Sequence, residues 1–458
     1  MNHRTPFACF ARFARSALAV GLALAFGAAL AAKSGSVPSG GGGSGGGGSG
    51  ATSAADPEVA GELMVKLRTT QALQPLLAKY SLTLMSQFGA RPIYRLKTLA
   101  GVRVKDVVGA LSVETDVMIA EANAQQRSPE ARKNVAWVIG TASAYVAQWA
   151  PQAMRLPEAQ QMSTGAGVRV AVLDTGVDRS HPALAGRLLP GRDFVDGDWD
   201  ASEGGSPASA SYGHGTHVAG LVALAAPGAQ IVPVRVLDAE GVGNAWALAE
   251  ALLWAIDPDG NPATDDGAQV VNISLGSLNR TRIMDSIALI ASCGVAISDD
   301  PIADRSDPGY RGDETRCRNV PGAVVVAAAG NDGSDTVKEY PAAEGAYGLM
   351  AVAATTPAGR IAGFSNDGNW IDLAAPGEGL TSTFPGGGYA TWSGTSMAAP
   401  LVAGTAALIR AADPGRPAKD VVQRMKRATA ALCNGDLVQL DADAAVSDSR
   451  NAAPLVCR

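Results

Sequence analysis

Four apolar segments, separated by stretches of helical periodicity, most constrain the fold of this 458-residue chain. Each segment is almost continuously apolar, which is typical of strands that are buried on both faces. Such strands belong to a parallel sheet with helices packed on both sides. The sequence therefore predicts an α/β fold, with strands over residues 167–173, 230–236, 269–273 and 323–329.

The composition supports a large folded core and argues against one class of partner. Hydrophobic residues make up 47% of the chain and charged residues only 17%, so wholesale disorder is excluded. The formal net charge is −6, whereas a nucleic-acid binder usually carries a basic stripe. We therefore expect no nucleic-acid partner.

Residues 1–31 have the pattern of a signal peptide. Arg12 and Arg15 precede an apolar run over residues 17–30, and small residues follow at the spacing of a cleavage site. A membrane anchor is the alternative, but the run is short and rich in alanine for a bilayer span. We expect a secreted protein, extracellular or periplasmic, that keeps no stable membrane span.

The rest of the chain divides by composition into five further regions. Residues 32–55 are mostly glycine and serine and predict a flexible linker. Residues 56–125 show the periodicities of a small α+β domain in the order β-α-β-β-α-β, for which a regulatory or binding domain is one interpretation. A polar, irregular region follows over 126–147, then the large α/β domain over 148–432 and a C-terminal tail over 433–458.

Four cysteines remain after the signal peptide is removed, and in an exported protein they favour disulfides. Four cysteines allow three pairings. We expect the local pairing, Cys293–Cys317 and Cys433–Cys457, which closes two loops of similar size and stabilises the fold by about 3 kcal/mol each in the chain-entropy model. Free buried thiols are the alternative.

Three distant segments each supply one group of a serine hydrolase. Asp174 ends a predicted strand, His214 lies between two glycines at the start of a small-residue helix, and Ser396 opens another such helix. A serine hydroxyl becomes an effective nucleophile when a histidine takes its proton and a carboxylate orients that histidine. Esterases of the α/β-hydrolase type use the order serine, acid, histidine with a Gly-x-Ser-x-Gly motif, which this chain does not follow.

Asn331 is the fourth candidate catalytic residue. It follows the strand over residues 323–329, and its side-chain amide could donate a hydrogen bond to a developing oxyanion. His217 lies three residues after His214 on the same predicted helix, and we expect it to be a structural, hydrogen-bonded histidine.

Taken together, these motifs resemble those of the subtilisin family of secreted serine endopeptidases; the matching residues are 174–178, 214–220, 271–276, 324–331 and 394–400. The resemblance implies a three-layer fold with a seven-stranded parallel sheet. It also implies that residues 56–125 are a propeptide that acts as an intramolecular inhibitor, and that 126–147 is the processing region of an autoprocessed precursor. Protein or peptide substrates, a monomer and chemistry without a cofactor are expected. A catalytically silent peptide-binding protein is the alternative.

The same resemblance implies where a substrate binds. One edge of the cleft would bind substrate backbone as an added strand, and the residues are Ser274, Leu275 and Gly276. A second segment would form the wall of the pocket for the residue before the scissile bond, and its residues are Ala327, Ala328 and Gly330. Glu339 stands where the family has the floor of this pocket. If it points inward, basic side chains are favoured; a one-residue shift places Lys338 there instead.

One acidic turn has the spacing of a calcium loop. Its oxygen ligands surround a glycine, and they are Asp257, Asp259, Asn261 and Asp266. Carboxylate and amide oxygens at such spacing suit Ca²⁺. A solvated acidic turn without an ion is the alternative. Any calcium here would be a structural ion.

Overall fold

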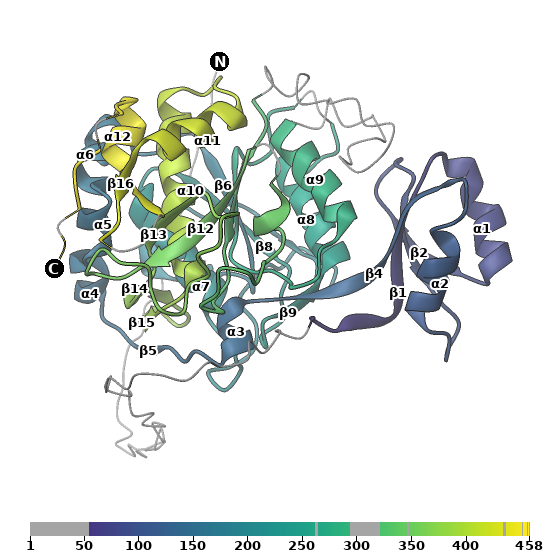
Figure 1. Cartoon of the computed structure of the whole chain (residues 1–458). Helices are drawn as coiled ribbons and strands as arrows, with labels where there is room; N and C mark the ends of the chain where they lie inside the picture. Colours follow the sequence, from purple (N-terminus) through teal and green to yellow (C-terminus); the bar gives the residue numbers. More distant parts are fainter. Residues whose placement is uncertain are drawn as a thin grey trace, which may run out of the picture. The chain divides into compact units, whose positions relative to one another are not determined.

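The computed structural model describes residues 55–261, 264–293, 321–345, 348–433, 437–450, 452–455 and 457. They belong to one compact unit, residues 53–458. Its N-terminal part (Figure 1) has the expected order β-α-β-β-α-β: β1 (Glu58–Leu67), α1 (Leu73–Tyr80), β2 (Thr83–Gln87), β3 (Ile93–Lys97), α2 (Val104–Leu111) and β4 (Val117–Arg127), with a 3₁₀ turn at Thr70–Ala72. Its antiparallel strands lie in the order β2-β3-β1-β4. Both helices pack on one face of them, because Leu63, Val65 and Leu96 share a core with Leu76 and Leu111.

The large sheet contains nine strands among the described residues, in the order β16-β17-β13-β12-β11-β10-β6-β8-β7. Their bounds are β6 (Arg169–Asp174), β7 (Arg192–Asp193), β8 (Gln230–Arg235), β10 (Val270–Ile273), β11 (Val324–Ala328), β12 (Leu349–Thr355), β13 (Leu373–Pro376), β16 (Thr429–Ala431) and β17 (Val438–Leu440). The expected number was seven; eight of the nine strands, from β17 to β7, form one parallel run. The two further strands are short edge additions: β7 has two residues, and β16 pairs antiparallel with β17.

Helices cover both faces of this sheet, as the continuous apolar strands predicted (Figure 1). Along β6, Val170 and Val172 face the core beneath α7 (His214–Ala225), α10 (Thr395–Ala412), α11 (Ala418–Arg427) and α12 (Ala442–Ser447). The alternate residues Ala171 and Leu173 face the core beneath α8 (Ala245–Ile256) and α9 (Arg282–Cys293). Among the described residues, only α10 is long and apolar enough to cross a bilayer; 89% of it is buried, as befits the central core helix.

The C-terminal segment is more than a tail. We expected the large domain to end at residue 432, but β17 pairs with β13 in the main sheet, and residues of α12 lie in the core beside α10. The signal was weak because each of these elements is shorter than a typical strand or helix. The expected disulfide between Cys433 and Cys457 is present, whereas the other expected pair, Cys293–Cys317, includes a residue, Cys317, that lies outside the described residues.

The region over 126–147 enters the large domain and is partly regular. It contains α3 (Pro129–Lys133), β5 (Val138–Ile139) and α4 (Ala142–Ala147), and α5 (Ala150–Ala153) and α6 (Leu156–Met162) follow. Helix α3 begins after Ser128, whose Oγ accepts a hydrogen bond from the Ala131 N–H, with proline in the first turn.

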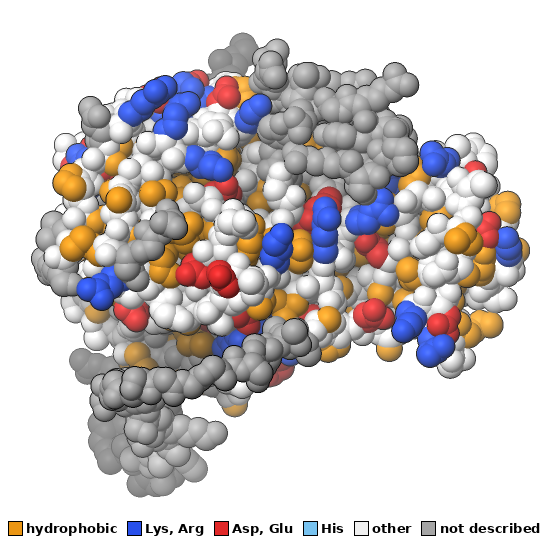
Figure 2. Space-filling view, in the orientation of Figure 1, with side chains coloured by type: hydrophobic (Ala, Val, Ile, Leu, Met, Phe, Trp, Pro, Cys, Tyr) orange, Lys and Arg blue, Asp and Glu red, His pale blue; other side chains and the backbone are white. Residues whose placement is uncertain are grey.

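The remaining elements lie beside these segments. Strand β4 continues past the small domain to pair with β9 (Val242–Asn244), while β5 joins β14 (Leu380–Phe384) and β15 (Gly388–Trp392) in a three-stranded antiparallel sheet. Short 3₁₀ turns occupy Pro182–Leu184 and Ala342–Glu344. On the face drawn in Figure 2, basic and acidic side chains of the described residues are interspersed rather than gathered by sign.

Candidate active site

Neighbouring strands of the large sheet end at one edge and bring three expected residues to it. Asp174 is the last residue of β6, Ser274 follows β10, and Asn331 lies just beyond β11. Strand β10 pairs in parallel with both β6 and β11, so these carboxyl ends are adjacent. Functional groups gather at this edge in open α/β sheets.

Asp174 and His214 are in direct contact. His214 Nδ1 lies 2.7 Å from Asp174 Oδ1, and both side chains are fully buried. His214 is the first residue of α7, which approaches the end of β6 closely: a Cβ on Gly215 would lie 2.1 Å from the Gly176 carbonyl oxygen. Glycine at position 215 therefore allows the helix to hold the imidazole against the carboxylate.

A residue that we did not single out in the sequence, Glu130 of α3, joins the expected catalytic groups. The Ser396 hydroxyl donates to Glu130 Oε2 over 2.7 Å, and His214 Nε2 lies 3.1 Å from the same oxygen. The Asn331 amide donates to Glu130 Oε1 over 2.8 Å. Ser396 and His214 therefore meet through one carboxylate oxygen, and the Glu130 side chain is fully buried among them.

Opposite charges in this cluster shift the pKa values of His214 and Glu130. Burial lowers the pKa of His214, but the carboxylates of Asp174 and Glu130 outweigh it and raise the pKa to about 10. Burial raises the pKa of Glu130, but its contacts with His214, Ser396 and Asn331 outweigh that effect and leave the pKa below its usual value. These pKa shifts favour a protonated His214 imidazole placed between the two carboxylates.

The Asn331 amide is fixed in its orientation by the start of α10. Asn331 Oδ1 accepts hydrogen bonds of 2.9 Å from both the N–H and the hydroxyl of Thr395. Because Oδ1 is engaged on that side, Nδ2 must face the cleft. An amide donor held in this way can stabilise negative charge without first reorganising.

Pro400 lies in the interior of α10, not in its first turn. We expected Ser396 to open this helix, but α10 begins one residue earlier, at Thr395. Proline lacks the N–H that would bond to the carbonyl four residues earlier, which is that of Ser396. The Ser274 hydroxyl donates to this free carbonyl over 3.0 Å, and Ser274 O lies 3.2 Å from Ser396 Oγ. Ser274 is therefore tied to the residue that carries the candidate nucleophile.

An extended segment of the chain already lies between Gly276, on the expected cleft edge, and β9, which we did not expect to take part. Arg127 exchanges two backbone hydrogen bonds with Gly276, of 2.8 and 2.9 Å, and its β4 neighbours pair with β9 on the other side. The Ser128 N–H then donates to the Gly241 carbonyl over 3.1 Å. This is strand addition at an exposed edge, and Gly276 is one of the residues predicted to provide it.

Glu339 does point inward, beside Gly276 and Gly330. Its side chain is fully buried, whereas Lys338 is exposed, so the alternative register with Lys338 inside does not occur. The other expected pocket residues contribute differently. The side chains of Leu275, Ala327 and Ala328 lie in the sheet cores, which leaves only their backbone to face a ligand.

The profile of one protein family, described as the subtilase family, matches residues 165–449. The chain belongs to the subtilase family of serine endopeptidases. The match covers Asp174, His214, Asn331 and Ser396, and it continues through α12, in agreement with the structural extent of the large domain.

Several characterised proteases resemble this subtilase. A thermophilic serine proteinase of Bacillus sp. strain AK1 is 35% identical over 305 residues, which cover 64% of each chain. Thermitase of Thermoactinomyces vulgaris is 36% identical over 60% of this chain and 85% of its own. An extracellular protease of Xanthomonas campestris pv. campestris is 33% identical over 74% of this chain and 60% of its own. The chain thus spans less than two thirds of the first and third of these relatives.

Solved structures agree on the fold. A protease from Pseudoalteromonas arctica PAMC 21717 superposes with a TM-score of 0.51 at 32% identity, covering 64% of this subtilase and 93% of that chain. Fervidolysin from Fervidobacterium pennivorans, described as a keratinolytic enzyme related to subtilisin, gives a TM-score of 0.64 at 22% identity. It covers 89% of this chain and 63% of its own, and at this identity it shows the fold alone.

Glu203 is a second residue that sequence reasoning missed. Its carboxylate accepts from the Thr175 hydroxyl over 2.5 Å and from the Thr216 hydroxyl and N–H over 2.7 and 3.0 Å. These threonines adjoin Asp174 and His214, so Glu203 links the two segments that carry them. Burial is the largest cause that raises the pKa of Glu203, to about 7. Its position in a glycine-rich polar loop gave no signal for this role.

His217 occupies a different environment from His214. Its Nε2 lies 3.2 Å from Leu380 O and 3.1 Å from Ala390 O, and its ring packs edge-on against Trp392. Burial lowers the pKa of His217 to about 3. A neutral histidine that binds two backbone carbonyls fits the expected structural role.

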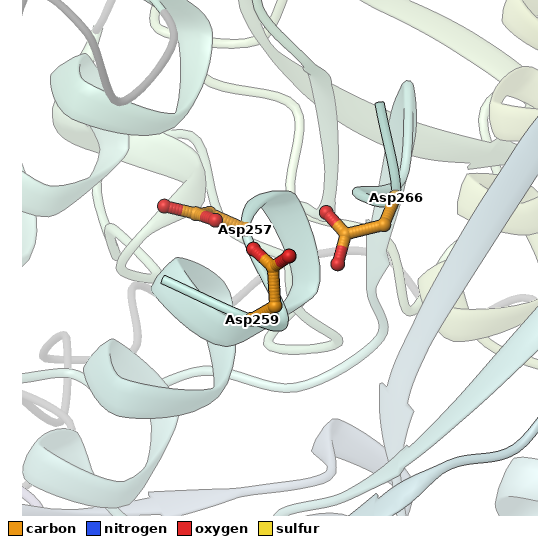
Figure 3. A group of neighbouring side chains, drawn as sticks. All are labelled: Asp257, Asp259 and Asp266. Carbon is orange, nitrogen blue, oxygen red and sulfur yellow. The ribbon is translucent and has the colours of Figure 1, made fainter. Parts of the chain in front are cut away.

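Three of the four expected calcium ligands come together (Figure 3). Asp257, Asp259 and Asp266 each offer a carboxylate oxygen, and these oxygens lie within 4.8 Å of one another. Burial, followed by the charges of Asp259 and Asp266, raises the pKa of Asp257. Asn261 donates its backbone N–H to Asp259 Oδ1, while Thr264 donates its hydroxyl to the same carboxylate. A divalent cation would relieve the repulsion, so the donor set fits Ca²⁺.

Proposed function

We propose that this subtilase is a secreted serine endopeptidase that is made as an autoprocessed precursor. The observation that carries the proposal is the convergence of Ser396 Oγ, His214 Nε2 and Asn331 Nδ2 on the carboxylate of Glu130. A substrate carbonyl at that place would meet a nucleophile, a base and an oxyanion donor at once. Asp174 contacts the other nitrogen of His214, which completes an Asp-His-Ser triad.

The reaction follows from these positions. Ser396 Oγ attacks the peptide carbonyl carbon while His214 Nε2 takes the hydroxyl proton, and Asp174 holds His214 in the required tautomer. The Asn331 amide and the Ser396 N–H stabilise the oxyanion. The C–N bond then breaks as His214 returns its proton to the leaving amine. Water attacks the acyl-enzyme with His214 again as base, which restores the serine. No cofactor takes part in these steps.

Substrates would bind where residues 125–128 now lie. The peptide backbone would add as a strand between Gly276 and the β9 edge, because Arg127 and its neighbours already use the hydrogen-bonding groups of these edges. Ser274, Leu275 and Gly276 form one side of this groove. The pocket for the substrate residue before the scissile bond would be lined by Ala327, Ala328 and Gly330, with Glu339 as its floor. Proteins and peptides, not nucleic acids, are the proposed partners.

Residues 56–125 would serve as the intramolecular inhibitor. Glu121 accepts hydrogen bonds of 2.8 and 3.0 Å from the Arg282 and Ile283 N–H groups, at the positive end of the α9 dipole. Asn123 Oδ1 accepts from the Trp246 N–H over 3.1 Å, and the Phe88 ring stacks on Trp246 at 4.1 Å. These contacts hold the small domain beside the groove, so its C-terminal strand continues directly into the site.

Glu130 would complete the inhibition within the processing region, residues 126–147. Helix α3 presents a side-chain carboxylate, not a peptide carbonyl, to Ser396 and His214. A carboxylate has no leaving group that the serine can displace, so the precursor is protected while α3 keeps this conformation. Residues 1–31 would direct export, residues 32–55 would act as a tether, and the mature enzyme would be a monomer.

Calcium would stabilise the mature enzyme without entering the reaction. Asp257, Asp259 and Asp266 would hold the ion, and Asn261 would complete the loop. Bound calcium would replace the mutual repulsion of three carboxylates by attraction to a common charge.

A fluorophosphonate probe tests the proposed function directly. It should label Ser396 of the mature enzyme stoichiometrically, and a Ser396→Ala variant should stay unlabelled. Lack of labelling in a folded wild-type protein would favour the alternative, a catalytically silent peptide-binding protein. The intact Asp174, His214, Asn331 and Ser396 give no support to that alternative.

A further inference from the structure

The floor of the proposed specificity pocket is a buried carboxylate between two glycines. Glu339 is fully buried. A Cβ on Gly276 would lie 2.6 Å from Glu339 Cγ, and one on Gly330 would lie 3.0 Å from Glu339 Oε2. Any larger residue on either wall would displace this side chain. The carboxylate is therefore set at the bottom of a slot whose walls are the two segments expected to bind substrate.

A guanidinium already occupies this slot. Arg132 Nη1 donates to both oxygens of Glu339, over 2.7 and 3.0 Å. Arg132 Nη2 donates to the Gly276 carbonyl over 3.1 Å and to Asp56 Oδ2 over 3.0 Å. Two of the three acceptor groups, Glu339 and the Gly276 carbonyl, belong to the large domain. These two groups form a binding site for a planar guanidinium, which can donate to both of them at once.

Maturation would remove this cation. Arg132 lies in the proposed processing region and Asp56 in the proposed propeptide, and among the described residues no other cation lies within ion-pair distance of Glu339. Burial is the main cause that raises the pKa of Glu339, to about 7, even with Arg132 present. A buried carboxylate whose partner has gone is unfavourable, and a substrate side chain that restores the pair recovers that free energy.

We infer that the mature enzyme cleaves preferentially after arginine, with Glu339 as the residue that selects it. The inference rests on the proposed function and names its substrate class. Arginine can satisfy Glu339 and the Gly276 carbonyl together, as Arg132 does. Lysine brings one compact charge and should be accepted less well. Apolar and acidic side chains at this substrate position leave the buried carboxylate without a partner, so peptides that carry them should be cleaved slowly.

A set of peptides that differ only in the residue before the scissile bond tests this selectivity. The mature wild-type enzyme should cleave the arginine peptide with a kcat/KM at least about 10²-fold above that of the leucine and phenylalanine peptides, with lysine in between. In Glu339→Gln the kcat/KM for the arginine peptide should fall about 10²-fold, and the kcat/KM for the leucine peptide should change little. Glu158→Gln, at an exposed glutamate, is the matched control and should keep the wild-type profile.

Two readouts separate the possible failures. Benzamidine, an aromatic amidinium, should inhibit the wild type competitively and Glu339→Gln much less. Fluorophosphonate labelling of Ser396 reports a working site independently of the pocket. A wild-type enzyme that is labelled and active but prefers leucine or phenylalanine overturns the selectivity alone, whereas one that is neither labelled nor active overturns the proposed function. If Glu339→Gln does not fold, the cleavage rates of the wild-type enzyme on the peptide set and its inhibition by benzamidine still test the selectivity for arginine.

Discussion

Glu130 accepts a hydrogen bond of 2.7 Å from the hydroxyl of Ser396. His214 Nε2 lies 3.1 Å from the same oxygen, so the Glu130 carboxylate lies between Ser396, the candidate nucleophile, and His214, its base. Charged hydrogen bonds of this kind are typically worth about 1.5–3 kcal/mol each. In the proposed precursor the catalytic groups would thus contact a side chain that cannot be cleaved, and release of Glu130 would be a step of maturation.

Glu130→Gln should hasten maturation. Glutamine offers one acceptor oxygen and no charge, so the loss of about 1.5–3 kcal/mol should raise the rate about 10- to 100-fold near pH 6. Intact-mass measurements on purified precursor would give the rate. Glu158→Gln should mature at the wild-type rate. Slower maturation of Glu130→Gln would show that the acid assists processing instead of preventing it.

The rate advantage of Glu130→Gln should depend on pH. The pKa of Glu130 is lowered, so its contribution is present above its unfolded value of about 4.3 and is lost at lower pH. The pKa of His214 is raised to about 10, so its contribution is complete below about 6.5 and is lost as pH rises through 10. The ratio of variant to wild-type rates should peak between about pH 5 and 6.5 and fall as the pH rises through 10, where only the contacts of Ser396 and Asn331 with Glu130 remain. A ratio independent of pH would contradict the ion pair.

Asn331→Ala should impair the chemical step and leave substrate binding nearly intact. In a subtilisin, loss of an oxyanion amide cost about 10²–10³ in kcat, and we expect a similar loss here because Thr395 fixes the Asn331 amide toward the cleft. Steady-state kinetics on one peptide would separate kcat from KM. An effect on KM alone would assign Asn331 to ground-state binding.

Glu203→Gln should weaken the link between the segments that carry Asp174 and His214. A glutamine cannot accept from the hydroxyls of Thr175 and Thr216 on both oxygens, so one donor loses its partner, at about 1–3 kcal/mol of unfolding free energy. We expect a lower Tm and a lower kcat with KM little changed. Urea unfolding and kinetics on the same preparation would check this. An unchanged Tm with reduced kcat would give Glu203 a purely catalytic role.

Calcium should raise the Tm of the mature enzyme. At a concentration 100-fold above its Kd, a ligand that binds only the folded state adds about 2.7 kcal/mol. Thermal unfolding with calcium and with a chelator would measure the difference. Asp259→Asn should abolish it, because Asp259 is one of three carboxylates that share the site. An equal calcium effect in wild type and variant would place the ion elsewhere.

Much of this site could be predicted from the sequence because its motifs are local. Asp174 ends an apolar strand and His214 opens a small-residue helix, and both positions follow from short patterns. The inward direction of Glu339 was one of two registers that the sequence allowed. The structure selects it through the contact with Arg132, which is 207 residues away in the chain.

Glu130 could not be predicted in the same way. Ser128 and Pro129 do signal the start of a helix, but its docking depends on β4 pairing with β9 and Gly276, which are more than 100 residues later. The strand count and the end of the large domain were also missed, because β7, β16 and β17 are two or three residues long. Elements this short acquire their structure from tertiary pairing.

The most direct measurement compares intact masses of purified wild-type and Ser396→Ala precursors over time, in the absence of other proteases. The wild type should lose its N-terminal residues, whereas Ser396→Ala should stay folded and full-length, because removal of the nucleophile costs about 10⁶ in rate. Maturation of Ser396→Ala at the wild-type rate would contradict the proposed catalytic centre.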